Sequence, residues 1–124
     1  MLRDRPPQLR ARFNAEADAL CISTVVLTEL LTRAWKSARP IETRREVERF
    51  AARLDVLPFD APAAAHAAEI RATLERQGQR IGAYDVLIAG HARSRGLVVV
   101  TGSLGGFRRV DGLRSEEWLS AAAA

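Results

Sequence analysis

The chain has 124 residues, of which 48% are hydrophobic and 27% are charged, and its formal net charge at pH 7 is +4. This length suits a single domain with one core, and no apolar run approaches the roughly 20 residues that cross a bilayer. The N-terminal residues contain no hydrophobic signal core, so we expect a cytoplasmic protein with no membrane segment. The basic balance permits contacts with nucleic-acid phosphates without requiring them.

The first third of the chain predicts a helix, a buried strand and a second helix. Pro6-Pro7 can open a helix, and Ala19-Leu20-Cys21-Ile22 is a short apolar run typical of a buried strand. Ser23 follows this strand as an N-cap for a helix over residues 24–38. The apolar positions of that helix form one stripe, made of Leu27, Leu30, Leu31, Ala34 and Ala38.

The middle of the chain predicts two more helices joined by a short extended segment. After Pro40, residues 41–54 show helical spacing of apolar side chains. The segment Val56-Leu57-Pro58-Phe59 is short and contains a proline, which indicates an edge strand or an extended link. Asp60 can cap a long helix that ends at Gln77-Gly78, where the glycine is a C-cap signal.

The last third of the chain predicts a helix followed by two strands. We expect a helix over residues 85–95, closed by Gly96, and then a buried strand over the continuous apolar run of residues 97–101. Residues 114–119 can form a last short strand. Since strands alternate with helices, the sequence predicts an α/β fold with a parallel sheet flanked by helices.

Three groups of motifs follow one another along the chain. The first is Cys21-Ile22-Ser23 followed by Leu27-Thr28-Glu29-Leu30. The second is Tyr84-Asp85 with Ile88-Ala89-Gly90-His91-Ala92 and Gly96-Leu97-Val98-Val99-Val100-Thr101, and the third runs from Phe107 to Trp118. Together they resemble PIN-domain toxins of the VapC type. The resemblance covers nearly the whole chain, so we expect one PIN-like domain over residues 1–119 and a frayed tail over residues 120–124.

This resemblance implies a toxin of a type II toxin–antitoxin pair. Such toxins resemble endoribonucleases that cleave RNA and depend on Mg²⁺ or Mn²⁺. The toxins are held inactive by a VapB-type antitoxin, and they commonly form homodimers. Mg²⁺ prefers oxygen ligands, largely carboxylates and waters, and it can activate a water for hydrolysis of a phosphodiester. In a parallel sheet, carboxylates at the C-terminal ends of strands or on adjoining helices converge in one crevice.

The family usually places metal ligands at four positions, and this sequence keeps two of them. On this resemblance, Glu29 and Asp85 are the metal-binding and catalytic residues. The fourth position holds Gly102 or Ser103. Gly102 offers no side-chain ligand, and Ser103 offers only a neutral hydroxyl. The first position is an aspartate that ends a first strand. On this resemblance we expect that strand to be missing from this chain, and Asp4 is a poor substitute for its aspartate.

We expect these departures to impair activity. Two carboxylates cannot match the ligation of four groups. A missing central strand would leave unpaired backbone groups on both neighbouring strands, at about 1–3 kcal/mol for each buried group. The alternative is a catalytically inactive relic that acts only as an antitoxin-binding or dimerising module.

Each candidate residue also has a simpler interpretation. Glu29 can pair with Arg33 on a solvated helix face, and Asp85 can be a helix N-terminal acid that interacts with the helix dipole. With the family match, we favour the metal role for Asp85. Four arginines are open to two interpretations, as a basic rim that contacts RNA phosphates or as solvated charges on exposed turns. They are Arg93, Arg95, Arg108 and Arg109.

The remaining candidates favour structural roles. His66 and His91 have no second metal-spaced partner, so each is interpreted as a surface or core histidine. The segment Gly102–Gly106 has neither the lysine nor the glycine order of a phosphate-binding loop, which favours a flexible turn. Trp35 is expected to pack, although it could also lie at a partner surface.

Overall fold

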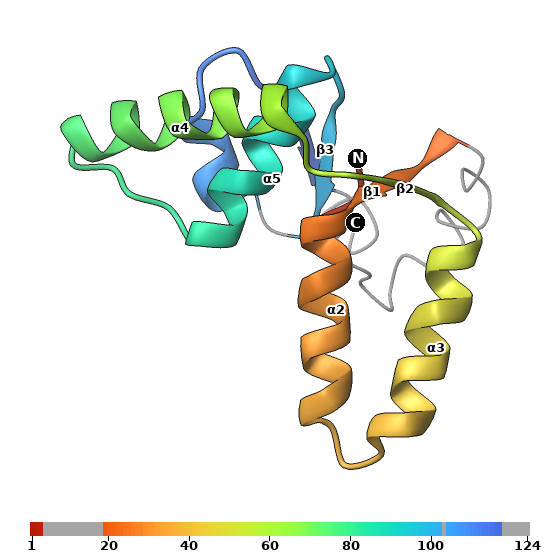
Figure 1. Ribbon diagram of the computed structural model, residues 1–124. Coiled ribbons are helices and arrows are strands. Elements are labelled where there is room, and N and C mark those ends of the chain that lie inside the picture. The colour runs from red at the N-terminus through yellow and green to blue at the C-terminus, as the bar shows by residue number, and fades with distance from the viewer. Residues whose placement is uncertain (4–18, 103, 118–124) are drawn as a thin grey trace.

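The computed structural model describes residues 1–3, 19–102 and 104–117 (Figure 1). The described strands are β1 (Cys21–Ser23), β2 (Asp55–Leu57), β3 (Val99–Thr101) and β4 (Ser115–Glu117). The helices are α2 (Thr24–Lys36), α3 (Pro40–Ala52), α4 (Ala61–Arg76), α5 (Ala83–Ser94) and the short 3-10 helix η3 (Gly105–Arg109). No helix in this part of the chain is long and apolar enough to span a bilayer.

Every described strand pairing is parallel, as the alternation of strands and helices predicts. Strand β1 pairs with β2 and strand β3 pairs with β4, with Cys21 opposite Asp55 and Val99 opposite Ser115. The predicted segments at Pro6-Pro7 and at residues 120–124 lie outside the described residues.

Residues 1–3 lie between β1 and β3 and join the two pairs of strands. The Leu2 amide donates to the Cys21 carbonyl at 2.8 Å, and the Arg3 amide donates to the Val100 carbonyl at 2.7 Å. Leu2 also forms an isolated parallel bridge with Val100. The prediction that both neighbouring strands face an empty place is therefore wrong at these positions, because three residues suffice to pair with them.

Helix α2 starts directly after β1 because Ser23 caps it. The Ser23 hydroxyl accepts a hydrogen bond from the Val25 amide at 3.0 Å, as predicted. The buried positions of α2 are Val26, Leu30 and Ala34. The predicted stripe is confirmed at Leu30 and Ala34. Leu27 and Leu31 are only half-buried, Ala38 lies beyond the helix, and the buried Val26 was not part of the predicted stripe.

Helices α2 and α3 form a hairpin that projects away from the strands (Figure 1). Phe50 is the buried anchor of α3. Trp35, near the far end of α2, is 56% exposed, and the Arg44 guanidinium lies over its ring at 5.5 Å from the centroid. The prediction that Trp35 packs in the interior is therefore wrong.

Helices α4 and α5 pack on each other in a second arm of the molecule (Figure 1). Asp60 caps α4 by accepting a hydrogen bond from the Ala63 amide at 3.1 Å, and Gly78 follows the helix with a φ of +68°, both as predicted. The contact between the two helices is close because Gly90 of α5 faces the backbone of Ala67.

Candidate active site

Glu29 and Asp85 are 56 positions apart in the chain, yet both contact the guanidinium of Arg3. Arg3 Nη1 lies 2.9 Å from Glu29 Oε1, and Arg3 Nε donates a hydrogen bond to Asp85 Oδ1, also at 2.9 Å. The side chains of Arg3, Glu29 and Asp85 are 16%, 11% and 29% exposed. The prediction that the two carboxylates of α2 and α5 point to one place is confirmed.

The topology explains why these side chains meet. Strand β1 ends at Ser23, so Glu29 lies in the second turn of the helix that begins there. Arg3 leaves the sheet beside Val100, close to the C-terminal end of β3. Asp85 lies in the first turn of α5. The residues therefore gather at the C-terminal edge of the parallel strands, which is where α/β proteins bind their ligands.

The charge at this edge is two carboxylates against one guanidinium. The contact of Arg3 with Asp85 is a well-formed hydrogen bond, whereas the contact with Glu29 is an ion pair by distance. Asp85 also lies at the positive end of the α5 dipole, which favours its carboxylate. The first-turn position of Asp85 and its approach to Glu29 are compatible with both interpretations of this residue. Glu29 forms an ion pair with Arg3, as does Asp85.

The chemistry of these donors fits a divalent cation, with a shortage of ligands. Mg²⁺ is commonly held by one or two carboxylates together with waters, so Glu29 and Asp85 are a donor pair that it accepts. Among the described residues, no cluster of three or more acidic, histidine or cysteine side chains could hold a metal ion. A cation at this place would also have to displace the Arg3 guanidinium.

The fourth predicted ligand position adds no described donor. Thr101 ends β3 with its side chain buried, and Gly102 follows it without a side chain. Ser103 lies outside the described residues, and so does Asp4. Gly102 contributes no side-chain ligand, as predicted, because glycine has no side chain.

Arg3 is the site residue that sequence reasoning missed. Nothing about an arginine in a polar N-terminal stretch signals a partner 82 positions away. The signal appears only when residues 1–3 are aligned between β1 and β3, which places Arg3 at the edge where Glu29 and Asp85 lie.

The four arginines of the predicted RNA rim fall into two groups. Arg93 and Arg95 are at the C-terminal end of α5, and Arg93 lies eight residues, or about 12 Å, along the helix from Asp85. Arg93 is also engaged, donating to His66 Nδ1 at 2.9 Å and pairing with Glu69 at 2.7 Å. Arg93 and Arg95 therefore lie at the opposite end of α5 from Asp85, and their contact with RNA stays a prediction.

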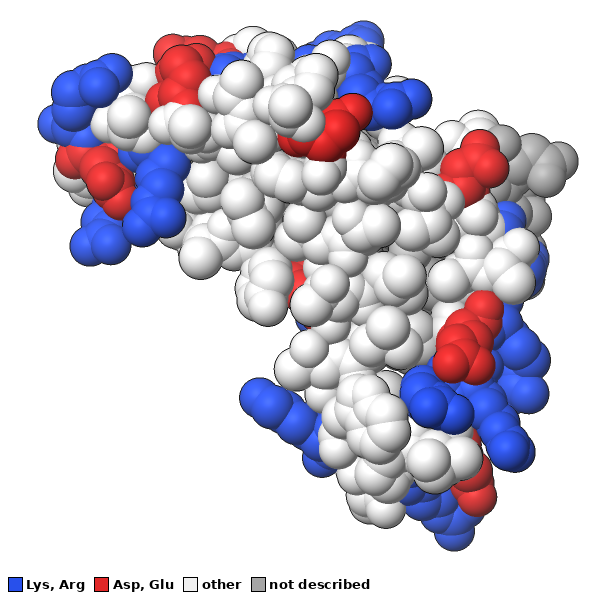
Figure 2. All heavy atoms as spheres, in the orientation of Figure 1, with Lys and Arg blue, Asp and Glu red and all other residues white. Residues whose placement is uncertain are grey.

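Arg108 and Arg109 lie in η3, which follows β3, and both are exposed. Arg109 Nη1 donates to the Arg80 carbonyl at 3.2 Å, which ties it to the segment before α5. These two arginines remain candidates for RNA contact. On the face drawn in Figure 2, basic and acidic side chains intermingle at the ends of the two arms, and no single basic patch dominates.

The two histidines are structural, as predicted. His91 is fully buried, and its Nδ1 lies 2.8 Å from the Ser23 hydroxyl. Phe59 packs edge-on against the His91 ring, with the centroids 5.6 Å apart. Burial lowers the pKa of His91, which keeps the imidazole neutral. His66 accepts the hydrogen bond from Arg93.

The glycine-rich segment is more ordered than predicted. Residues 105–109 form η3, and a Cβ at Gly106 would lie 2.4 Å from Ile81 Cγ2. Gly106 is therefore needed for close packing against the chain before α5. The prediction of a flexible turn is wrong for this part.

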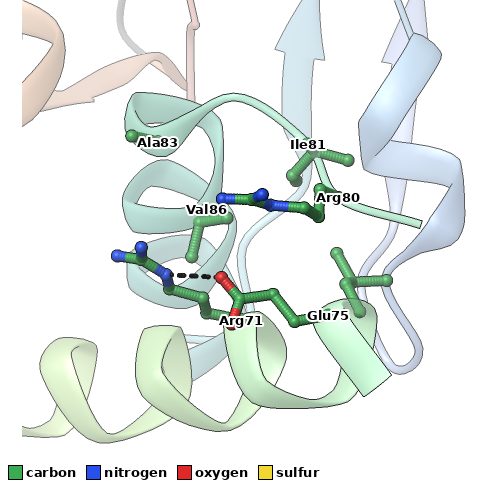
Figure 3. Close-up of a pocket in the computed structure, with 7 residues that line it drawn as sticks. Arg71, Glu75, Arg80, Ile81, Ala83 and Val86 are labelled. Carbon is green, nitrogen blue, oxygen red and sulfur yellow. Dashed lines mark hydrogen bonds and ion pairs between the residues drawn. The ribbon is translucent and has the colours of Figure 1, made fainter. Parts of the chain in front are cut away.

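A small pocket lies between the end of α4 and the start of α5 (Figure 3). Arg71 and Glu75 line it and pair with each other at 3.1 Å, and Arg80 and Ile81 cover another side. The pocket includes none of Arg3, Glu29 and Asp85. The pocket lining holds one carboxylate, whereas two carboxylates meet around Arg3, so the Glu29–Asp85 pair is the better candidate for chemistry.

Comparison with known proteins agrees with this geometry. The PIN domain model matches residues 1–113. The tRNA(fMet)-specific endonuclease VapC of Shigella flexneri is 48% identical over 117 residues, which cover 94% of this chain and 89% of that protein. The ribonuclease VapC2 of Haemophilus influenzae (strain Rd) is 40% identical over 119 residues, which cover 96% of this chain and 90% of that protein.

Solved structures give the same result. A DNA-bound VapBC complex from Salmonella typhimurium contains a chain that is 49% identical, with a TM-score of 0.85 and coverage of 91% of this chain and 86% of that one. VapBC2 from Rickettsia felis, bound to a promoter DNA fragment, contains a chain that is 30% identical, with a TM-score of 0.83 and coverage of 91% and 86%. The chain therefore belongs to the VapC family of PIN-domain proteins.

Proposed function

We propose that this chain is a toxin that hydrolyses RNA phosphodiester bonds at the Glu29–Asp85 pair with a divalent metal ion, Mg²⁺ or Mn²⁺. The observation that carries the proposal is the convergence of two carboxylates from separate helices on one guanidinium, at 2.9 Å each. The ribonuclease names of the relatives support RNA as the substrate class. The tRNA(fMet) named for the Shigella flexneri relative is the first RNA to test.

In this proposal, Glu29 and Asp85 would hold the metal ion. A bound Mg²⁺ would supply an activated water and neutralise charge on the phosphodiester. The two carboxylates sit on helices anchored by the buried residues Val26 and Ile88, so their separation is set by packing rather than by flexible loops. The positive end of the α5 dipole beside Asp85 favours the approach of an anionic phosphate.

Two features support the further proposal that activity is impaired. The carboxylates already share an arginine, and Gly102 offers no oxygen from its side chain. A metal ion would therefore depend on water for most of its ligands and would meet a competing positive charge.

The test is cleavage of a labelled tRNA(fMet) and of a mixed RNA by the purified chain, with Mg²⁺, with Mn²⁺ and with EDTA. Hydrolysis by water activated at the metal should leave 3′-hydroxyl and 5′-phosphate ends. Asp85→Asn and Glu29→Gln should each strongly lower the rate of metal-dependent cleavage, whereas Asp55→Asn, which removes an exposed carboxylate from β2, should not. Cleavage that survives in Asp85→Asn would overturn the assignment of Asp85.

The second candidate is an inactive toxin relic that engages an antitoxin or dimerises. It is favoured by the same Arg3 contacts, which offset part of the carboxylate charge without a metal ion. It predicts no turnover at any metal concentration. Robust cleavage that needs Asp85 would eliminate it.

Both candidates include a VapB-type antitoxin as partner. The solved relatives named as VapBC complexes support this proposal. Copurification of the chain with the VapB-type protein of its own organism tests it, and sedimentation of the chain alone tests the proposed homodimer. A chain that is monomeric and does not bind that antitoxin would contradict both assignments.

A further inference from the structure

We propose that the Arg3 guanidinium occupies the Glu29 and Asp85 carboxylates and competes with a divalent metal ion for them. This inference rests on the proposed function, because it concerns the same two carboxylates. It adds a residue that the metal-binding pattern of the family does not contain. It also predicts that the metal affinity of the chain is set by displacement of a side chain.

The geometry makes Arg3 more than a nearby charge. Two different nitrogens of one guanidinium contact two carboxylates that come from α2 and α5. The planar, always-charged guanidinium suits this double contact, which a lysine ammonium would match less well. With the Arg3 and Glu29 side chains 16% and 11% exposed, water screens the interaction poorly.

The backbone of Arg3 is fixed while its side chain can move. The Arg3 amide is hydrogen-bonded to Val100, so the residue keeps its place in the sheet. Its long side chain has rotatable bonds, and the guanidinium can leave the carboxylates without loss of strand pairing. Metal entry therefore requires a change of rotamer and the separation of two ion pairs, not unfolding.

The electrostatic balance predicts the direction of competition. Within this group of three described side chains, one guanidinium and two carboxylates carry a net charge of −1, whereas a divalent ion would neutralise both carboxylates. A guanidinium and a metal ion close together would repel each other, and this repulsion is strong where screening is poor. Removing the charge of Arg3 should thus strengthen metal binding even though it removes a contact.

The experiment measures Mn²⁺ binding by electron paramagnetic resonance, with no RNA present. The variants are Arg3→Met, which keeps an apolar stem, and Arg3→Lys, which keeps the charge. The matched control is Arg39→Met, since Arg39 is 77% exposed and pairs with Glu42 at the surface. Circular dichroism melts establish that each variant is folded.

We expect Arg3→Met to bind Mn²⁺ about tenfold or more tightly than the wild type, because a unit charge a few ångströms away changes cation affinity by at least this factor. Arg3→Lys keeps the charge but makes a poorer double contact, so its affinity should lie between those of the wild type and Arg3→Met. Arg39→Met should stay within about twofold of the wild type. The gain should vanish when Asp85→Asn is added to Arg3→Met. A folded Arg3→Met that binds Mn²⁺ no more tightly than the wild type would overturn the proposal.

A second measurement uses the unaltered chain, so the proposal stays testable if Arg3→Met does not fold. In ¹⁵N NMR, the Arg3 Nε–H group should exchange slowly with water because it donates to Asp85. Excess Mg²⁺ should accelerate that exchange by releasing the guanidinium. Fast exchange without metal, or slow exchange at saturating metal, would contradict competition.

The two proposals can fail separately. If Mn²⁺ binding tightens in Arg3→Met but no variant cleaves RNA, the competition stands and the ribonuclease function falls. If the chain cleaves RNA in an Asp85-dependent way and Arg3→Met changes neither binding nor cleavage, the function stands and the role of Arg3 falls.

Discussion

The packing of α5 on α4 predicts that Gly90→Ala is strongly destabilising. A Cβ at position 90 would lie 2.4 Å from the Ala67 nitrogen, 2.5 Å from its Cα and 2.6 Å from its Cβ. Carbon atoms in good contact are about 3.5–4.0 Å apart, so α5 would have to move about 1 Å away from α4. Two of the three atoms are backbone, which no change of rotamer can move.

The magnitude follows from two opposing terms. Overpacking usually destabilises a protein by about 1–3 kcal/mol, and a clash with backbone atoms should cost about 3 kcal/mol. Replacing glycine by alanine inside a helix returns about 1 kcal/mol of helix propensity. We therefore expect the free energy of unfolding to fall by about 2 kcal/mol, which for a domain of this size lowers Tm by about 8 °C.

Urea unfolding followed by circular dichroism measures this change. Gly82→Ala is the matched control, because a Cβ there would meet only Asp85, at an ordinary 3.5 Å, and its cost should stay within about 1 kcal/mol. Ala67→Gly should not rescue Gly90→Ala, since it removes one of three clashes. A Gly90→Ala variant as stable as the wild type would refute the reasoning, and so would full rescue by Ala67→Gly.

The same substitution reaches the site through α5. Asp85 lies in the first turn of this helix, and Gly90 is one and a half turns further along. A shift of about 1 Å in a reacting group can lower a rate about 100-fold. In the folded fraction, Gly90→Ala should therefore reduce any metal-dependent RNA cleavage more than Gly82→Ala does.

Three further predictions concern stability. Since burial lowers the pKa of His91, the unfolded chain binds a proton below its ordinary value of about 6.5 while the folded protein does not. The contribution of neutral His91 to stability is thus fully present above this pH and declines below it. Between pH 7.5 and pH 5.5, the free energy of unfolding in urea should fall less in His91→Gln than in the wild type. Asp60→Ala removes the cap on the Ala63 amide and should cost about 1 kcal/mol by thermal melting, with no loss contradicting the cap. Gly106→Ala should also be destabilising in the same melts, by about 1–3 kcal/mol, because the added Cβ would lie 2.4 Å from Ile81 Cγ2 and 2.8 Å from Ile81 Cβ, which moves only with the backbone. An unchanged Tm would contradict this packing.

Local signals in the sequence predicted most of the element boundaries. Ser23 and Asp60 cap helices through their own side chains, so neighbouring residues suffice to reveal them. Gly78 and Gly96 adopt φ values of +68° and +65° after helices, which is the conformation that a C-terminal glycine signals. The parallel pairing follows from the alternation of strands and helices, which is also a property of the chain order.

The missed features depend on contacts between distant segments. Val26, rather than Leu27, is buried in α2, because the direction of the buried face is set by what the helix packs against. A helical wheel defines a stripe only to within about one position when apolar residues are as frequent as here. Trp35 is exposed although the neighbouring Ala34 is fully buried, because successive positions of a helix face different sides.

The candidate site was predictable in part for the same reason. Glu29 and Asp85 could be named because each belongs to a motif, and their convergence follows from the parallel topology. Arg3 could not be named, because its role depends on how residues 1–3 pair with β1 and β3. The contacts of Arg93 with Glu69 and His66 could not be predicted either, because its sequence position does not show them.

The most direct test of a shared carboxylate centre is a double-mutant cycle on RNA cleavage. The rates compared are those of the wild type, Glu29→Gln, Asp85→Asn and the double variant under single-turnover conditions with Mg²⁺. If both carboxylates serve one centre, the double variant should be no slower than the worse single variant. Losses that simply multiply, or a single variant with wild-type activity, would contradict the account.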